Sequence, residues 1–245
     1  MRHLGGVAAR GAAAILLGAW ALLGCSGGDA HDDAAGDGTP AATPDEAAPD
    51  EGAPEETAPD EGESGWTVTV YYTAVESHHD GEPVAVTGCP VLDCTHGDSE
   101  LGSYPEDFVT AVQQEGTGRI VHGPHAGEYL NWSWDVGYWL DSAPRDSYGA
   151  PLEPFVSAAA DAGVLARGDH VRIEDCGTTE EGEPIEPEVC ETLSAASWVV
   201  TDEFTPGFGG DHHMDAYIGE ETGPGFTDSP LYTTLNDATL TVTHA

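Results

Sequence analysis

Lysine is absent from this 245-residue chain, and only six arginines stand against 45 aspartates and glutamates. The formal net charge at pH 7 is −39. Such a field repels nucleic acid phosphates and anionic lipid headgroups, so we expect no nucleic acid partner. A surface adapted to a saline habitat would have the same composition. Motifs of a Ser-His-Asp elbow, a phosphate loop or a nucleotide fingerprint are lacking as well.

A long hydrophobic run is also lacking. Arg2 and Arg10 flank the start of the apolar segment 11–23, which is short for a membrane span and typical of a signal peptide. The segment ends in Leu22-Leu23-Gly24-Cys25, which resembles the bacterial lipobox. The resemblance implies removal of residues 1–24, lipidation of Cys25 and anchoring to the cell envelope through this lipid only. The alternative is an ordinary secretory signal with a chance cysteine.

The residue after the cysteine bears on the location. Ser26, with no aspartate beside it, resembles the lipoproteins that are sorted to the outer membrane, if the host is Gram-negative.

Residues 25–64 lack large apolar side chains and consist mainly of Ala, Gly, Pro, Thr, Asp and Glu. Prolines recur at Pro44, Pro49, Pro54 and Pro59, each followed by two acids. Such a segment has too little apolar surface to form a core, and charge repulsion keeps it extended. We expect a disordered tether, with a binding segment for a basic partner as the alternative.

Residues 65–245 are long enough for one domain with a core of its own. Of the 45 acidic residues, 13 lie in the tether and 32 in this domain, against four arginines, so the domain surface itself is acidic.

Cysteine is scarce, and its use agrees with export. Apart from Cys25 there are four, Cys89, Cys94, Cys176 and Cys190, an even number in an oxidising compartment. Three pairings are possible. The two close pairs bracket loops that contain Pro or Gly, so we expect Cys89 with Cys94 and Cys176 with Cys190. A zinc site is the rival, but the spacing lacks the usual CxxC pairs.

Long helical patterns are missing too. The segment 66–72 alternates at period two, with Trp66, Val68, Val70 and Tyr72 on one face, which predicts a strand. A single short helix is expected over 103–116, with Ser103 as its cap and Gly116 at its end. Such a pattern favours a mainly β fold, a small barrel with loop insertions. Further short strands are expected over 119–122, 129–135, 155–160, 170–174, 197–202, 213–218 and 239–243.

Three aspartates lie in or beside these predicted strands. Asp161 precedes a turn and a strand, Asp202 ends Val199-Val200-Thr201-Asp202, and Asp215 lies in His213-Met214-Asp215-Ala216-Tyr217. The three segments resemble the three-aspartate domain of bacterial wall proteins, a six-stranded double-psi β-barrel shared with membrane-bound lytic transglycosylase A and, more distantly, with expansins. Two departures are a longer loop without the family's lysine after Asp202, and an insertion over 178–196.

The resemblance implies roles for these residues. Asp215 would act as general acid and then base on a glycosidic bond, with Asp202 as a partner. Asp161 is the third catalytic candidate, with a mainly architectural role. The chemistry requires a raised pKa at Asp215, which burial or a neighbouring carboxylate supplies. The alternative is that the aspartates only accept backbone N–H bonds at strand ends.

Other side chains are candidates for substrate binding. His213 can orient the aspartates, Tyr138 and Trp139 can stack on sugar rings, and Asp141 can lie at the rim. Adjacent strand residues point to opposite faces, so His212 and His213 make no simple ligand pair, and we expect no metal and no cofactor.

Together these features predict a monomeric envelope protein that acts on peptidoglycan or another wall glycan by lytic transglycosylase-like cleavage. The alternatives are a non-catalytic, expansin-like glycan-binding module and a structural surface lipoprotein.

Overall fold

The computed structural model describes residues 62–205, 207 and 209–245. The expected signal peptide, Cys25 and nearly all of the expected tether lie outside the described residues. Within the described ranges, no helix is long and apolar enough to cross a membrane.

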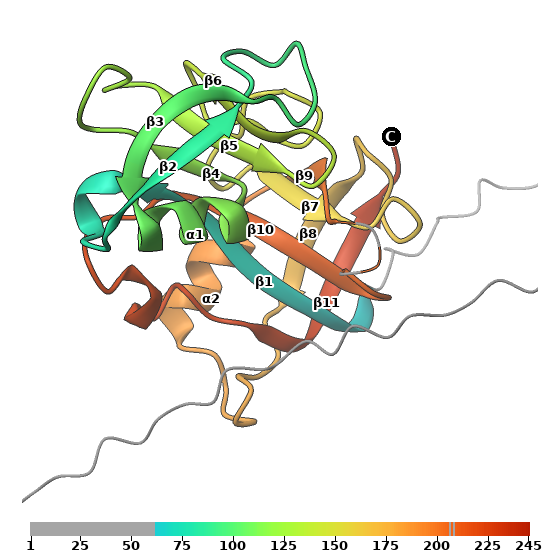
Figure 1. Cartoon of the computed structure of the whole chain (residues 1–245). Helices are drawn as coiled ribbons and strands as arrows, with labels where there is room; N and C mark the ends of the chain where they lie inside the picture. Colours follow the sequence, from blue (N-terminus) through green and yellow to red (C-terminus); the bar gives the residue numbers. More distant parts are fainter. Residues whose placement is uncertain (1–61, 206, 208) are drawn as a thin grey trace, which may run out of the picture. The chain divides into compact units, whose positions relative to one another are not determined.

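Six strands close into a barrel, as the sequence predicted (Figure 1). Around the barrel their order is β1, β11, β8, β9, β7 and β10, and β10 pairs with β1 again. The β1–β10 and β7–β9 pairs are parallel and the other four are antiparallel. The strands are β1 (Glu63–Val75), β7 (Ser157–Ala160), β8 (His170–Asp175), β9 (Trp198–Glu203), β10 (His213–Glu220) and β11 (Leu235–Thr243).

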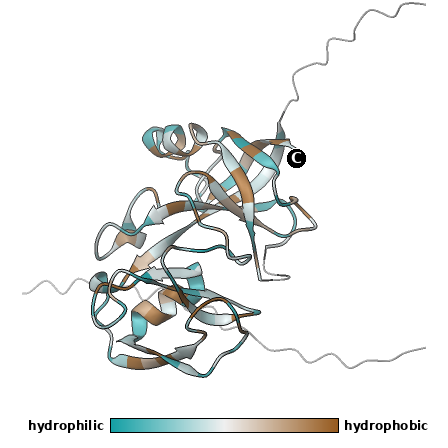
Figure 2. Ribbon diagram, turned by 90° about the horizontal axis from the view of Figure 1, so that it is seen from above, coloured by the Kyte–Doolittle hydropathy of each residue, from teal (hydrophilic) through white to brown (hydrophobic). Residues whose placement is uncertain are grey.

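The barrel interior is filled by alternate residues of these strands. Val68, Met214, Ala158, Val171 and Leu240 are almost completely buried, and Figure 2 shows hydrophobic and hydrophilic positions mixed along the strands. Because successive strand residues point to opposite faces, the residues between them lie on the outside of the barrel. Asp202 and Asp215 lie on this outer side.

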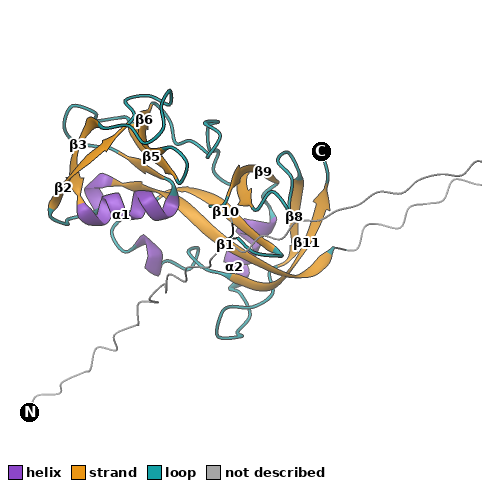
Figure 3. Ribbon diagram, turned by 45° about the vertical axis from the view of Figure 1, so that its right-hand side comes forward, coloured by secondary structure: helices purple, strands orange, loops and turns teal. Residues whose placement is uncertain are grey.

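A second group of elements is inserted between β1 and β7. β4 continues the sheet from the end of β1, and β5 and β6 follow it, while β2 and β3 form a separate pair. Figure 3 shows these strands and α1 on one side, with β1 and β10 running from them into the barrel. The elements are β2 (Pro83–Gly88), β3 (Ser99–Pro105), α1 (Glu106–Glu115), β4 (Thr117–Arg119), β5 (Tyr129–Ser133) and β6 (Gly137–Asp141).

The expected helix is present but begins later than predicted. α1 follows Pro105, and Ser103 is not its cap because pairing with Ala85 holds Ser103 in β3. Gly116 ends the helix in the left-handed conformation, as expected. Phe108 packs close to β4, where a Cβ at Gly118 would lie 2.7 Å from the Phe108 ring.

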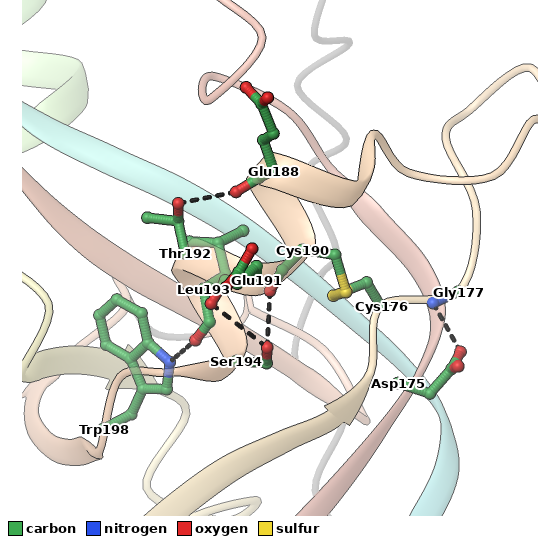
Figure 4. Close-up of a disulfide and its surroundings, with 10 residues drawn as sticks. All are labelled: Asp175, Cys176, Gly177, Glu188, Cys190, Glu191, Thr192, Leu193, Ser194 and Trp198. Carbon is green, nitrogen blue, oxygen red and sulfur yellow. Dashed lines mark hydrogen bonds between the residues drawn. A yellow bond between two sulfur atoms is a disulfide. The ribbon is translucent and has the colours of Figure 1, made fainter.

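A second helix, α2 (Pro187–Ser194), corrects the prediction of a single helix. It lies within the insertion after β8, and its sequence signal was only Pro187 at the first turn. Figure 4 shows how it is attached: Cys190 is disulfide-bonded to Cys176, and Trp198 Nε1 donates to the Leu193 carbonyl at 3.1 Å. Both expected disulfides, Cys89–Cys94 and Cys176–Cys190, are confirmed. Two single-turn 3-10 helices, η1 (Glu76–His78) and η2 (Phe226–Asp228), complete the elements.

Candidate active site

A row of side chains crosses four neighbouring strands on the outside of the barrel. Asp215 on β10 is paired with Thr69 on β1 and, on its other side, with Ala159 on β7. Ala159 is in turn paired with Asp202 on β9. Neighbouring strands lie about 4.8 Å apart, so only the methyl group of Ala159 separates the two carboxylates. The register therefore brings Asp202 and Asp215 together on one face.

Asp215 carries the clearest electrostatic signal. Burial, and next the charge of Asp202, raise its pKa to about 7, against the opposing effect of hydrogen bonds from Thr69 and the Ala216 N–H. Its Oδ1 atom is buried without a hydrogen-bond partner in the described structure. A carboxyl group in this state can hold a proton near neutral pH and deliver it to a bound oxygen.

Asp202 is held more firmly. Its Oδ1 accepts hydrogen bonds from the N–H groups of Ser147 and Glu203, both at 2.8 Å, and Tyr71 donates to Oδ2 at 3.4 Å. Burial raises the Asp202 pKa, while these hydrogen bonds oppose the rise. Burial and the charges of Asp202 and Asp215 also raise the pKa of Tyr71, so its hydroxyl stays a donor.

Asp161 lies at the end of β7 and anchors the glycine-rich loop before β10. Its Oδ2 accepts the Gly210 N–H at 2.9 Å. A Cβ at Gly209 would lie 2.4 Å from the Phe204 ring and 2.8 Å from the Asp161 carboxyl carbon, so glycine is required there. The close approach of this loop explains the glycine pair after Asp202.

His213 connects that loop to Asp215. Its Nδ1 donates to the Gly209 carbonyl at 2.8 Å, and its Nε2 lies 2.8 Å from Oγ1 of Thr69, the strand neighbour of Asp215. Since a carbonyl only accepts, Nδ1 carries the hydrogen. Thr69 has a single hydroxyl hydrogen, which it donates either to His213 Nε2 or to Asp215. Thr69 was not found from the sequence, because only the parallel β1–β10 register places it there.

Asp146 is a third carboxyl group of this region. It is completely buried in the loop after β6, and it accepts the N–H groups of Tyr148 at 3.0 Å and Ala150 at 2.7 Å. Burial raises its pKa to about 6. This loop also supplies the Ser147 N–H to Asp202. The sequence indicated only a loop here, since nothing local shows that it folds back onto β9.

Three further expected binding residues lie in β6. Trp139 is fully buried with Cys89 and Val136, so it has no surface for a sugar ring, which corrects the stacking role expected for it. Tyr138 lies in β6, partly buried against α1, and Asp141 is ion-paired with Arg145 at 2.7 Å. Trp139 was misassigned because dense aromatics fit a core strand as well as a binding surface.

The histidines do not form a metal site in the part of the chain described. No cluster of three or more His, Cys, Asp or Glu side chains there could hold a metal ion. His79 bridges Glu221 at 2.9 Å and Asp107 at 3.4 Å, and its pKa is raised chiefly by the hydrogen bond to Glu221.

Comparison with known proteins gives structural neighbours only. No protein-family model and no curated protein matches the sequence. The chain is similar to E. coli MltA with bound chitohexaose at 11% identity, covering 74% of this chain and 72% of that one, with a TM-score of 0.46. A membrane-bound lytic murein transglycosylase from Agrobacterium tumefaciens matches at 12% identity over 72% and 73%, with a TM-score of 0.43.

A third neighbour is the lytic transglycosylase LtgG of Burkholderia pseudomallei, at 12% identity over 72% of each chain and a TM-score of 0.36. The neighbours are thus lytic transglycosylases, the group whose motifs the three aspartate segments resemble. At these values the similarity assigns no residue role in this chain.

Proposed function

We propose that this protein cleaves the glycan strands of peptidoglycan by a lytic transglycosylase-like reaction, with Asp215 as general acid and base. One observation carries the proposal: Asp215, with a pKa of about 7, has an oxygen without a partner among the described residues and lies beside a second carboxyl group. Paired groups with separated proton affinities are the arrangement that acid–base chemistry on a glycosidic bond requires.

The reaction needs no cofactor and no added water. Protonated Asp215 gives its proton to the glycosidic oxygen as the bond to C1 of the sugar breaks. Asp215 then accepts the proton of the C6 hydroxyl while the C6 oxygen bonds to C1, which closes an anhydro ring and restores the acid. An ionised Asp202 would stabilise the positive charge that develops at C1.

The test is digestion of purified peptidoglycan by the full chain, with anhydro-muropeptides measured by mass spectrometry. We expect release by the wild type and its loss in Asp215→Asn. Asp237→Asn is the matched control, because Asp237 is exposed on β11 and its φ of 56° suits asparagine. Absence of anhydro products from the wild type would refute the cleavage proposal.

The second candidate is a non-catalytic glycan-binding module. Its support is the loop after Asp202, which lacks the family's lysine and is held by Asp161 and His213. Co-sedimentation with insoluble peptidoglycan separates the classes: binding without release identifies a binder, and neither binding nor release leaves a structural surface protein.

We also propose that the protein is a monomer that is anchored to the envelope through a lipid on Cys25. Mass spectrometry of the mature N-terminus, produced in the bacterial host, tests the lipid anchor. The support for the anchor is the sequence of the leader segment. Cys25→Ser should abolish the lipid mass and release the protein from membranes, whereas an unmodified Cys25 in the wild type would contradict this location.

A further inference from the structure

Tyr148 and Arg167 form an exposed pair next to the carboxyl groups. Tyr148 is 49% exposed, and the Arg167 guanidinium lies over its ring at 4.1 Å from the centroid. The Tyr148 hydroxyl is hydrogen-bonded to Glu203, the residue after Asp202. The ring and the guanidinium are therefore held in place from two sides although both face solvent.

This pair is connected directly to the proposed active site. Arg167 Nη2 lies 3.5 Å from Oδ2 of the buried Asp146. Asp146 fixes the loop whose Ser147 N–H binds Asp202. A ligand on the guanidinium would thus lie beside the row of Asp202 and Asp215.

The four arginines of the described domain differ in how firmly they are paired. Arg119 and Arg145 each bind a carboxylate closely, at 2.9 and 2.7 Å. Arg167 and Arg172 are loosely paired, at 3.5 and 3.7 Å, and are 46% and 69% exposed. Arg172 is paired with Glu174 of its own strand, β8, so among the described arginines Arg167 is the loosely paired one beside Asp146.

Guanidinium chemistry indicates the ligand. Stacking on an aromatic ring fixes the plane of the guanidinium and leaves its edge free to bind a carboxylate with two hydrogen bonds. In the described structure Arg167 makes a single long hydrogen bond, to Asp146. On a domain with 32 acids and four arginines, a negatively charged ligand has few other places to bind.

We infer that Arg167, held on the ring of Tyr148, is a specificity-determining residue that binds a carboxylate of the glycan substrate. The inference rests on the proposed function, since it places this contact beside Asp202 and Asp215. It predicts that the protein prefers glycans that bear carboxylates over neutral ones.

The experiment compares two substrates with the full chain. Peptidoglycan strands stripped of their peptides carry a free lactyl carboxylate on every second sugar, whereas chitohexaose carries none. We expect Arg167→Ala to lower cleavage of the stripped strands about tenfold, the usual effect of losing a charge-assisted hydrogen bond. Its cleavage of chitohexaose should be unchanged, and the control Arg172→Ala should behave as the wild type on both.

Two further measurements keep the inference falsifiable. In the first, the affinity of both glycans is measured in the Asp215→Asn variant, with and without Arg167→Ala. The comparison tests the contact between Arg167 and the carboxylate in the absence of cleavage. Tyr148→Phe, which keeps the ring, should retain the preference. An equal loss on both glycans, or no loss, would overturn the role of Arg167, whereas a wild type that cleaves neither glycan would refute the proposed function instead.

Discussion

At the junction of β1 with the inserted segment, Glu76 is 8% exposed and accepts hydrogen bonds from the N–H groups of Val121 at 2.7 Å and His122 at 2.9 Å. On the outside of the barrel, Oδ1 of Asp215 is buried with no partner among the described residues. Both carboxyl groups are removed from much of the solvent. Burial alone therefore does not distinguish a structural acid from a reactive one; a buried oxygen that lacks a donor among the described residues, as in Asp215, does.

The sharpest test of this contrast is the Asp215→Asn variant. Asp215→Asn should lower glycan cleavage at least about a hundredfold, because general acid–base catalysis contributes that much or more. It should leave the protein folded, since no hydrogen bond to Oδ1 is lost. Rates of muropeptide release and circular dichroism of the same samples check both statements. Equal losses of activity and fold would make Asp215 structural.

The raised pKa of Asp215 should also make the stability of the folded protein depend on pH. Asp215 has a folded pKa of about 7, above its ordinary value of 3.8, so the folded state keeps a proton that the unfolded chain releases from about pH 4 upward. The unfolded state thus binds fewer protons in this window, and stability falls as pH rises through it. The raised pKa values of Asp146, about 6, and Glu115, about 8, act in the same direction.

We expect the free energy of unfolding to fall between pH 4 and pH 8, and Asp215→Asn to remove up to about 4 kcal/mol of that fall. Urea unfolding at pH 4 and pH 8 measures it. A slope unchanged by the substitution would show that the Asp215 pKa is ordinary.

Glu76→Ala should lower stability and leave cleavage unchanged, the reverse of the result expected for Asp215→Asn. It leaves the N–H groups of Val121 and His122 without their acceptor, at a cost of about 2 kcal/mol of stability. Cleavage per folded molecule should remain that of the wild type. Thermal unfolding and activity normalised to the folded fraction check this, and Glu76→Gln, which keeps an acceptor oxygen, is the matched control.

The pH profile of cleavage should shift by a smaller amount, and in opposite directions, when Thr69 or Asp202 is replaced. Hydrogen bonding by Thr69 lowers the Asp215 pKa and the charge of Asp202 raises it. In kcat/KM, which requires protonated Asp215, the alkaline limb should move up in Thr69→Val and down in Asp202→Asn, each by about one pH unit or less. Shifts in the same direction would contradict this assignment.

The barrel strands were predictable because their signal is local. Apolar alternation in 66–72 gave the buried face of β1, and close cysteine spacing gave both disulfides. The start of α1, the existence of α2 and the strands β2, β3 and β6 were missed or misread, since short segments follow their tertiary contacts rather than their propensity.

The candidate site, too, was predictable only in part. The sequence by itself placed Asp202 and Asp215 in strands, because alternating β-branched and aromatic residues mark a half-buried strand wherever it pairs. Only the tertiary structure put Ala159 between them, set Thr69 beside Asp215, brought Asp146 and Arg167 to the same face and buried Trp139. Strand register and loop docking join residues far apart in the chain, and one residue of slip would turn each side chain to the other face.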